Sequence, residues 1–445
     1  MEEPEEVPKT DELMKFYMSY KGSNQFSVMG EKGICLRKIF KDGDETEKAC
    51  WSWKEFSIES QIISKTSKKE YYKFSWDNED YPPLSLKDMR NLMEIKCNLG
   101  GSIGKNIFGP MVNEYCNVNN IPIVEGVELC GWDNGWILPS EHYIIDGNSE
   151  ILKGFYDNIG VMNNHIYDPT MPHQFRELYD SIGVRYRDVI LAFGMIAPFM
   201  FSIMDETDFL MFLGLYSNKN QSGKTYMGQM ITKKFWGHSE NLNSTIMNSP
   251  SRARDYLCSS TLPILIDECE KLNDACVDTV KTMATSKSKG QYKNIDQTLG
   301  MNKYLCATPV YTMNTPSEIF HDMAYLTRGI LLDLNIRDFD NRDEFKRCYS
   351  KIKDGAIGRF IIENTRDLTK KMLINQFHSI NIDDPQIKGR SRTNMRLLVL
   401  GGWIFEKVFG WELDLSKLTT AILSSEKMEV TDYIRDEEEV EVSHE

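Results

Sequence analysis

The sequence predicts an α/β core, in which helices flank a parallel β-sheet, between an amino-terminal α+β domain and a carboxy-terminal helical region. Between residues 171 and 336, short apolar runs alternate with helical patterns, which is typical of parallel strands covered by helices. Residues 13–170 combine β-rich alternating runs with helical patterns, whereas residues 337–425 follow mainly the 3.6-residue period of helices. The 445 residues leave room for several such units.

The formal net charge of −14 lies mostly at the two ends of the chain. Residues 1–12 contain six acidic residues and one basic residue, and residues 426–445 contain nine acidic and two basic residues. The rest of the chain therefore carries a net charge of only −2. We interpret both ends as solvated acidic tails, so the overall charge does not exclude a basic groove for nucleic acid inside the fold.

The cysteine pattern and the longest apolar run indicate a cytoplasmic protein without a membrane partner. The ten cysteines are scattered without a C-x-x-C pair, so we expect reduced thiols and no zinc site. The run "VILAFGMIAPFMFSIM", residues 189–204, includes Pro198 and is shorter than the roughly 20 residues that span a bilayer. We expect a buried helix there.

The runs "NQFSVMGEKGICLRKIF", "ACWSWKEFSIESQIIS" and "EYYKFSW" predict an antiparallel sheet within residues 13–85. Two helical patterns follow, "LKDMRNLMEIKCNL" and "FGPMVNEYCNVNN", and a Trp-Asp-Asn-Gly turn then separates two strand-like runs. The aromatic residues of the sheet suggest either a nucleic-acid platform or, more typically, one buried face of the sheet. These residues are Trp51, Trp53, Tyr71, Tyr72, Phe74 and Trp76.

Two predicted helices, the second strongly apolar, lead into a strand, a turn and a helix that together could bind a phosphate. The strand is "FLMFLGLY", the turn is "SNKNQSGKT" and the helix is "TYMGQMITKKFW". Such a site needs a turn whose backbone N–H groups converge and a helix whose positive N-terminus faces the anion. The 3.6-residue period places Tyr226, Met230, Ile231 and Phe235 on one face of this helix.

The turn ends in the Gly-Lys-Thr of the pattern G-x-x-x-x-G-K-[ST]. Lys224 would reach the β- and γ-phosphates, Thr225 would bind Mg²⁺, and Gly223 lets the backbone approach the phosphates. Asn218 replaces the first glycine, a mild departure because asparagine tolerates positive φ better than other non-glycine residues. The turn residues expected to bind ATP are Asn218, Gln221, Ser222, Gly223, Lys224 and Thr225.

A second segment, "LPILIDECEKLND", supplies two carboxylates after a short apolar run. A buried strand here would deliver Asp267 and Glu268 to the carboxyl edge of the sheet, where ligands of open α/β folds bind. We expect Asp267 to bind ATP by holding its Mg²⁺, and Glu268 to activate the attacking water. An exposed strand end with ordinary acids is the alternative, but "PILI" is too apolar for an exposed strand.

Two further polar residues flank predicted strands. Asn314 ends "YLCATPVYTMN", where it could hydrogen-bond the γ-phosphate or the attacking water, or simply form a turn before Thr-Pro. Arg328 precedes the apolar end of "AYLTRGILLDL". It could neutralise charge at the γ-phosphate of a neighbouring subunit, as an arginine finger does, or it could be a solvated arginine beside a strand.

In this order the turn, the Asp-Glu strand, the asparagine and the arginine resemble AAA+ ATPases, and more closely the superfamily III helicases of viruses and mobile elements. The segments "SGKTYMGQMITKKFWG", "MNTPS" and "LTRGILLDL" are similar to a family in which an amino-terminal domain precedes a P-loop helicase module. "GVELCGWDNGWILPS" and "GRSRTNMRLLVLGGWIFEKVFGWEL" extend the similarity over most of residues 20–420. Nothing after residue 425 resembles the winged helix that often closes such proteins.

The resemblance implies an ATP-driven DNA helicase that acts in the replication of a mobile or viral element and depends on ATP and Mg²⁺. It would work as a homo-oligomeric ring, expected to be a hexamer, with single-stranded DNA in its central pore and Arg328 supplied by the neighbouring subunit. Segment 284–296 lies at the family's position for a pore hairpin, where Lys287, Lys289 and Lys293 could bind DNA phosphates. A basic surface loop without this role is equally compatible.

Other interpretations remain open at this point. A protein-remodelling or regulatory AAA+ ATPase would share the nucleotide site but would need no nucleic-acid track. A non-catalytic scaffold is disfavoured, because a protein that only binds nucleotide does not need Glu268 beside Asp267. Arg390, Arg392 and Arg396 could act on ATP in a second-sensor role or on DNA, or could simply begin a solvated helix.

Overall fold

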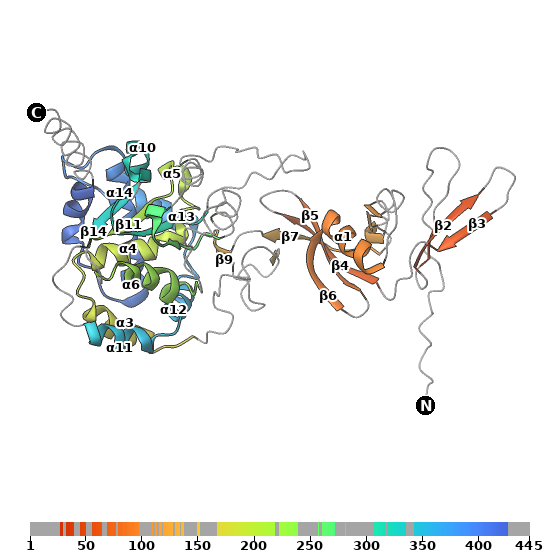
Figure 1. The fold of residues 1–445 in the computed structure, drawn as a ribbon, viewed down its shortest axis with the longest axis horizontal. Helices are drawn as coiled ribbons and strands as arrows, with labels where there is room; N and C mark the ends of the chain where they lie inside the picture. Colours follow the sequence, from red (N-terminus) through yellow and green to blue (C-terminus); the bar gives the residue numbers. More distant parts are fainter. Residues whose placement is uncertain are drawn as a thin grey trace, which may run out of the picture. The chain divides into compact units, whose positions relative to one another are not determined.

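The chain forms two compact units, which are described separately below (Figure 1). Unit 1 comprises residues 1–128 and 148–153, and unit 2 comprises residues 129–147 and 154–445. The structure, a computed structural model, describes residues 27–29, 33–39, 45–49, 56–64, 69–76, 79–97, 108–109, 112–113, 115–117, 119–127, 130–133, 135–137, 149–151, 167–218, 222–238, 257, 260–271, 281, 306–316, 318–334 and 342–425.

Unit 1 contains two sheets. The first is antiparallel and consists of β1 (Ser27–Met29), β2 (Gly33–Ile39) and β3 (Glu45–Ala49). The second has the order β10-β7-β4-β5-β6, with β4 (Phe56–Ser64), β5 (Glu70–Trp76), β6 (Glu79–Ser85), β7 (Ile123–Val127) and β10 (Ser149–Ile151). Strands β4, β5 and β6 are antiparallel as predicted, whereas β7 and β10 add parallel pairs.

The second sheet of unit 1 packs its apolar face against helical residues. Helix α1 (Leu86–Cys97) follows β6, and further helical residues lie within 108–117. Tyr72 and Phe74 alternate along β5 and are both buried, so the packing interpretation is confirmed for these two aromatic residues. The buried cluster consists of Ile58, Tyr72, Phe74, Met89, Phe108, Val112 and Cys116.

Unit 2 is built on a four-stranded parallel sheet with the order β12-β13-β11-β14. Its strands are β11 (Phe212–Tyr216), β12 (Ile264–Ile266), β13 (Pro309–Met313) and β14 (Gly329–Asp333). A separate hairpin pairs β8 (Gly131–Trp132) with β9 (Trp136–Ile137). Nearly every residue of the four sheet strands is buried, as expected for parallel strands covered on both faces.

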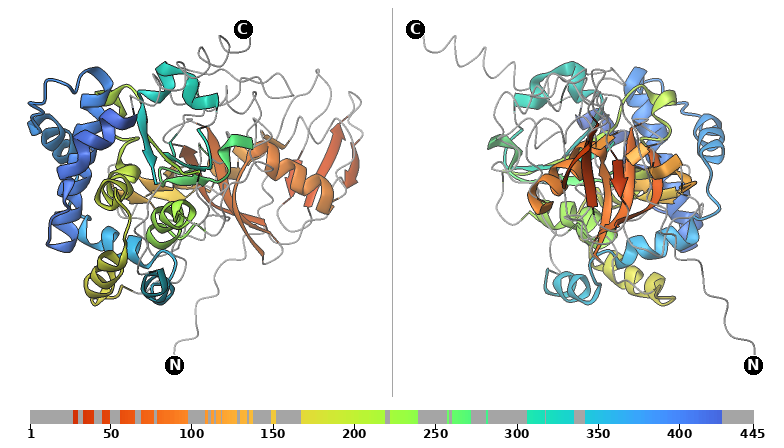
Figure 2. Two further views of the ribbon diagram at one scale, coloured as in Figure 1. Left: turned by 60° about the vertical axis from the view of Figure 1, so that its left-hand side comes forward. Right: turned by 90° about the vertical axis from the view of Figure 1, so that its right-hand side faces the viewer.

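Helices lie around this sheet in each ribbon view of unit 2 (Figure 1 and Figure 2). They are α3 (Met171–Ser181), α4 (Arg187–Ile196), α5 (Met204–Thr207), α6 (Lys224–Gln229), α10 (Met323–Leu326), α11 (Arg342–Lys351), α12 (Ala356–Asn364), α13 (Lys370–Ser379), α14 (Gly389–Phe409) and residues 418–425. A π-helical segment, Met230–Phe235, continues α6. The predicted α/β core is therefore present, and helices α11 to α14 follow the sheet along the chain.

Close packing joins the helices to the sheet and to one another. A Cβ atom added at Gly228 of α6 would lie 2.8 Å from the Leu265 side chain of β12. One added at Gly401 of α14 would lie 2.1 Å from the carbonyl oxygen of Ala192 in α4, so even an alanine would push these two helices apart. In α4 itself, every residue from Val189 to Ile196 is buried, which confirms the first half of the buried helix predicted for residues 189–204. The α-helix ends at Ile196 and a 3₁₀ turn, Ala197–Phe199, follows, because Pro198 has no N–H group to continue the helical hydrogen bonds.

The β8–β9 hairpin belongs to unit 2 by its contacts. The backbone N–H of Trp132 donates to Thr261 Oγ1 at 2.8 Å, and Trp136 Nε1 donates to Thr365 Oγ1 at 2.9 Å. The Trp136 ring also stacks on Trp236, with centroids 5.4 Å apart. The predicted amino-terminal domain of residues 13–170 included this hairpin, and its boundary remains a prediction.

The outer edge of β14 is covered by the helical region. The Leu331 N–H donates to Ser425 Oγ at 2.9 Å, and Asn394 Nδ2 of α14 donates to the Gly329 carbonyl at 3.1 Å. Because these contacts occupy backbone groups that a further strand would need, they close this edge of the sheet to β-pairing with another chain.

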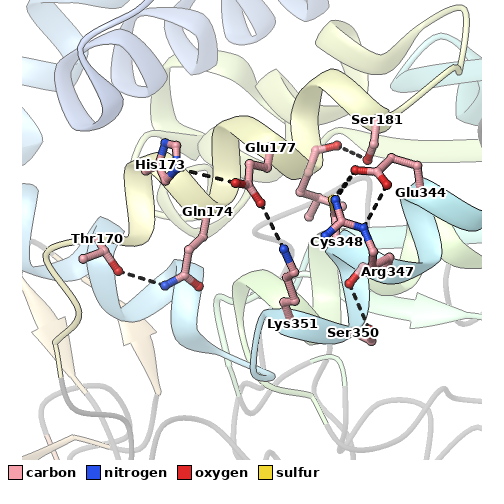
Figure 3. A network of polar contacts seen from close by, with 11 residues as sticks. Thr170, His173, Gln174, Glu177, Ser181, Glu344, Arg347, Cys348, Ser350 and Lys351 are labelled. Atoms are coloured by element: carbon pink, nitrogen blue, oxygen red, sulfur yellow. Dashed lines mark hydrogen bonds and ion pairs between the residues drawn. The ribbon is translucent and has the colours of Figure 1, made fainter.

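Helices α3 and α11 are connected by a network of polar side chains on the surface (Figure 3). Glu177 of α3 lies 3.5 Å from His173 on its own helix and 3.3 Å from Lys351 Nζ on α11. Arg347 and Glu344 form a further ion pair within α11. Exposed pairs of this kind contribute about 0–1 kcal/mol each, so these charges add little to the stability of the contact between the two helices.

No helix in the described part of the chain is long and apolar enough to cross a membrane.

We expect the stability of unit 2 to fall between pH 7 and pH 4 because of His238. Burial lowers the pKa of His238 to about 4, and its Nε2 atom has no hydrogen-bond partner among the described residues. The unfolded state binds more protons than the folded state between this pKa and about 6.5, so the free energy of unfolding drops by about 3 kcal/mol as the pH falls through this window. Urea unfolding at several pH values should show that the free energy of unfolding of His238→Gln falls less between pH 7 and pH 4 than that of the wild type. The exposed His173, changed to Gln, serves as the control and should keep the wild-type pH dependence.

Candidate functional site

The turn after β11 positions the start of α6 at the carboxyl edge of the sheet. Gly223 adopts φ +86° immediately before Lys224, a conformation that favours glycine. Asn218 is exposed and is not among the described non-glycine residues with positive φ, so tolerance of that conformation does not explain the asparagine. Gln221 lies outside the described residues.

The prediction of a single apolar face on the helix is wrong for one of its four residues, Tyr226. Met230, Ile231 and Phe235 are fully buried as predicted, but Tyr226 is 40% exposed. Its ring contacts Phe345 of α11, with centroids 5.8 Å apart, instead of entering the core. The helix widens to π geometry from Met230, which shifts the register by about one residue, so a constant 3.6-residue period does not extend back to Tyr226.

The parallel register aligns the predicted polar residues at one edge. Strand β13 lies between β11 and β12, and its Tyr311 pairs with Ile266 and Gly214. One residue further along, the Thr312 hydroxyl donates to a carboxylate oxygen of Asp267. The two strand ends are therefore linked through a side chain that sequence reasoning did not single out.

Lys224 and Asn314 meet at the same edge. Lys224 Nζ donates to Asn314 Oδ1 at 2.7 Å and lies 3.4 Å from the carbonyl oxygen of the buried Ser217. The two residues are 90 positions apart in the chain, so only the strand order brings them together. Glu268 is exposed and has φ +54°, which turns the chain sharply after β12.

Glu270 is a site residue that the sequence predictions missed. Its Oε1 atom accepts from Asn314 Nδ2 at 2.8 Å and from the Asn314 backbone N–H at 3.3 Å. Its Oε2 atom is buried and has no hydrogen-bond partner among the described residues. The Glu-Cys-Glu spacing was a usable signal, because the buried Cys269 separates two acids on a strongly curved turn.

Arg328 is placed away from these residues. It precedes the amino end of β14, whereas Lys224 and Asn314 lie beyond the carboxyl ends of the neighbouring strands, about 16 Å away along a five-residue strand. Only 8% of Arg328 is exposed, and its guanidinium donates to the Ala324 carbonyl. Burial, and then the charge of Arg390, lower the pKa of Arg328.

The three arginines predicted to act on ATP or DNA lie in different environments. Arg390 Nη1 lies 3.2 Å from Thr327 Oγ1, beside Arg328 and away from Lys224 of the same chain. Arg392 is exposed, and Arg396 Nε donates to the Ile380 carbonyl at 3.1 Å. The candidate DNA-binding residues lie outside the described part of the chain; they are Lys287, Lys289 and Lys293.

The residues at the carboxyl edge fit a phosphate and a hard cation. The Ser222 hydroxyl is buried beside Gly223 and has no hydrogen-bond partner among the described residues, so it is available to an anion. Thr225 and Asp267 offer oxygen ligands, which Mg²⁺ prefers. No cluster of three or more His, Cys, Asp or Glu side chains suited to a metal occurs among the described residues.

Comparison with known proteins shows a similar fold. The solved structure "SCCmec type IV Cch - active helicase" matches with a TM-score of 0.52 and 12% sequence identity, over 94% of this chain and 78% of that one. The apo A form of the NrS-1 C-terminal region is a weaker match, with a TM-score of 0.31 and 12% identity, over 83% of this chain and 92% of that one. No family model matches the sequence. No curated protein sequence matches it either. At this identity, the first match shows that the fold of the chain is similar to that of a helicase.

Proposed function

We propose that this protein is an ATP hydrolase that separates DNA strands as a ring-shaped homo-oligomer, a hexamer in our proposal. The observation that carries the proposal is the meeting of Lys224 with Asn314, beside the Asp267–Thr312 pair, at the carboxyl edge of a parallel sheet. Similarity to the fold of the SCCmec helicase supports DNA as the partner. We further propose an AAA+ P-loop core and a role in replicating a mobile or viral element, on the resemblance of the sequence motifs to superfamily III helicases.

Each residue at the carboxyl edge would have a separate role in ATP hydrolysis. Thr225 and Asp267 would hold Mg²⁺, which neutralises negative charge on the phosphates. Lys224 would bind β- and γ-phosphate oxygens. The water oxygen forms a bond to the γ-phosphorus while the bond to the bridging oxygen of ADP breaks, and the proton lost by the water passes to Glu268. Arg328 of a neighbouring subunit would neutralise the charge that develops on the transferred group.

Strand displacement tests the proposal directly. The protein should unwind a duplex that carries a 3′ or a 5′ single-stranded tail, only with ATP and Mg²⁺, and single-stranded DNA should accelerate ATP turnover. Binding to that DNA should weaken with salt, because basic residues in 284–296 would contact phosphates. ATP turnover without DNA stimulation, together with no salt-sensitive DNA binding, would instead favour the protein-remodelling ATPase.

A further inference from the structure

The Asn314 side chain lies between two charged groups of opposite sign. Its Oδ1 atom faces Lys224 Nζ at 2.7 Å, and its Nδ2 atom faces Glu270 Oε1 at 2.8 Å. An ammonium group can only donate hydrogen bonds, and an ionised carboxylate can only accept them. The amide can therefore satisfy both neighbours in one orientation only, with its oxygen toward Lys224 and its nitrogen toward Glu270.

Glu270 is itself held firmly in place. It lies in the 3₁₀ turn Cys269–Lys271, which follows the sharp bend at Glu268. Within this turn the buried Cys269 Sγ lies 3.7 Å from Met313 Sδ on β13, the residue before Asn314. The turn is thus attached to the end of β13 by a sulfur contact and by the two hydrogen bonds from Asn314 to Glu270.

From this geometry we infer that Glu270 positions Asn314 so that the amide presents an acceptor, and not a donor, to the bound nucleotide. The inference rests on the proposed ATPase function and decides between the two roles open to Asn314. A carbonyl oxygen repels phosphate oxygens, but it accepts hydrogen bonds from water and from Lys224. Asn314 therefore orients the attacking water and steadies Lys224, and it does not donate to the γ-phosphate.

Two substitutions of Glu270 separate this role from a general structural one. Glu270→Gln keeps an acceptor for Asn314 Nδ2, so we expect kcat within about threefold of wild type, because the retained hydrogen bond preserves the amide orientation. Glu270→Ala removes the acceptor and frees the amide to rotate, so kcat should fall by about 10- to 100-fold, the scale of loss caused by misplacing a reacting group. The nucleotide Kd, from titration with a fluorescent ATP analogue, and Tm should stay close to wild type for both variants.

Glu268→Gln is the matched control, because it makes the same chemical change two residues earlier. It should abolish turnover, since a glutamine cannot accept the proton of the attacking water. If Glu270→Gln were as inactive as Glu268→Gln, Glu270 would itself be the base. If Glu270→Ala kept wild-type kcat, a freely rotating amide would suffice. Either result overturns the inference.

A reciprocal exchange tests the orientation of the amide. Asn314→Asp places a second carboxylate against Glu270 and should lose turnover. In the double variant Asn314→Asp, Glu270→Gln, the glutamine amide donates to one aspartate oxygen and leaves the other as an acceptor toward Lys224. We expect the kcat of the double variant to be at least about tenfold higher than that of Asn314→Asp, because substitutions at contacting residues are coupled. No recovery would mean that the site needs the donor of Asn314, contrary to the inference.

The failure of this inference can be told apart from the failure of the proposed function. If wild-type protein and Lys224→Ala show the same background turnover, the chain is not the proposed ATPase. If wild-type turnover depends on Lys224 but not on the acceptor at Glu270, only the positioning role is wrong.

Discussion

Lys224→Ala should reduce ATP turnover by about 10²- to 10³-fold or more, because the variant lacks the ammonium that we propose stabilises charge on the transferred phosphate. This ammonium is held by Asn314 Oδ1 and the Ser217 carbonyl oxygen, so little rearrangement is needed for it to reach phosphate oxygens. Steady-state phosphate release and nucleotide titration would measure the effect, and both kcat and affinity should decline.

Lys233→Ala is the matched control for this experiment. Lys233 lies on the same helical stretch, and its half-exposed side chain pairs with Asp354 at 3.4 Å. Its loss should cost no more than about 1 kcal/mol of stability and should leave turnover unchanged. Wild-type turnover in Lys224→Ala would remove the phosphate-loop assignment, since no other lysine is placed beside Asn314 in the described part of the chain.

Arg328→Ala should abolish turnover while nucleotide affinity stays near wild type. The proposed role requires this arginine to act on a neighbour's nucleotide, and its position at the amino end of β14 is far from the Lys224 of its own chain. In enzymes that use an arginine finger, loss of its guanidinium lowers kcat by about 10³- to 10⁵-fold, because the charge that develops on the transferred phosphate is no longer neutralised. Phosphate release and equilibrium nucleotide binding, measured on the same preparation, would show the separation.

Mixing two inactive variants provides the sharper readout. In a ring formed from equal parts of Lys224→Ala and Arg328→Ala chains, about one site in four combines an intact Lys224 with an intact neighbouring Arg328, given a heterologous interface and random assembly. The mixture should therefore regain up to that fraction of wild-type turnover. A mixture as inactive as its parts, although mixed rings form, would contradict a shared site.

Arg185→Ala serves as the control for Arg328→Ala. Arg185 is exposed just before α4 and is not a candidate site residue, so its removal should affect neither turnover nor Tm. Arg328 is nearly buried and bound to the Ala324 carbonyl, so the Tm of Arg328→Ala must be compared with wild type before its turnover is interpreted.

The positions of Asp267 and Asn314 could be predicted because each residue directly follows an apolar run in the sequence. The runs before Asp267 and Asn314 form the buried strands β12 and β13, and parallel strands deliver their carboxyl ends to one edge. Local pattern was enough to place each residue at a strand end. The hydrogen bonds between those ends depend on strand order, which no single run encodes.

The features that the sequence predictions missed depend on contacts between distant segments or on local backbone geometry. The role of Glu270 requires β12 and β13 to be neighbours, and the exposure of Tyr226 depends on α11 and on the change to π geometry. The burial of Arg328 reflects the packing of α10 and α14 around it. Hydrophobic periodicity reports which side of an element is apolar, but it does not report what packs against that side.

The path of the chain between the two units limits how modular the protein can be. Residues 129–147 belong to unit 2, yet residues 148–153 return to unit 1, where β10 pairs with β7. If the chain were divided at any single position in this region, either the β8–β9 hairpin would be separated from unit 2 or β10 would be separated from its sheet. The amino-terminal unit therefore cannot be exchanged as a continuous segment without also moving or breaking part of unit 2.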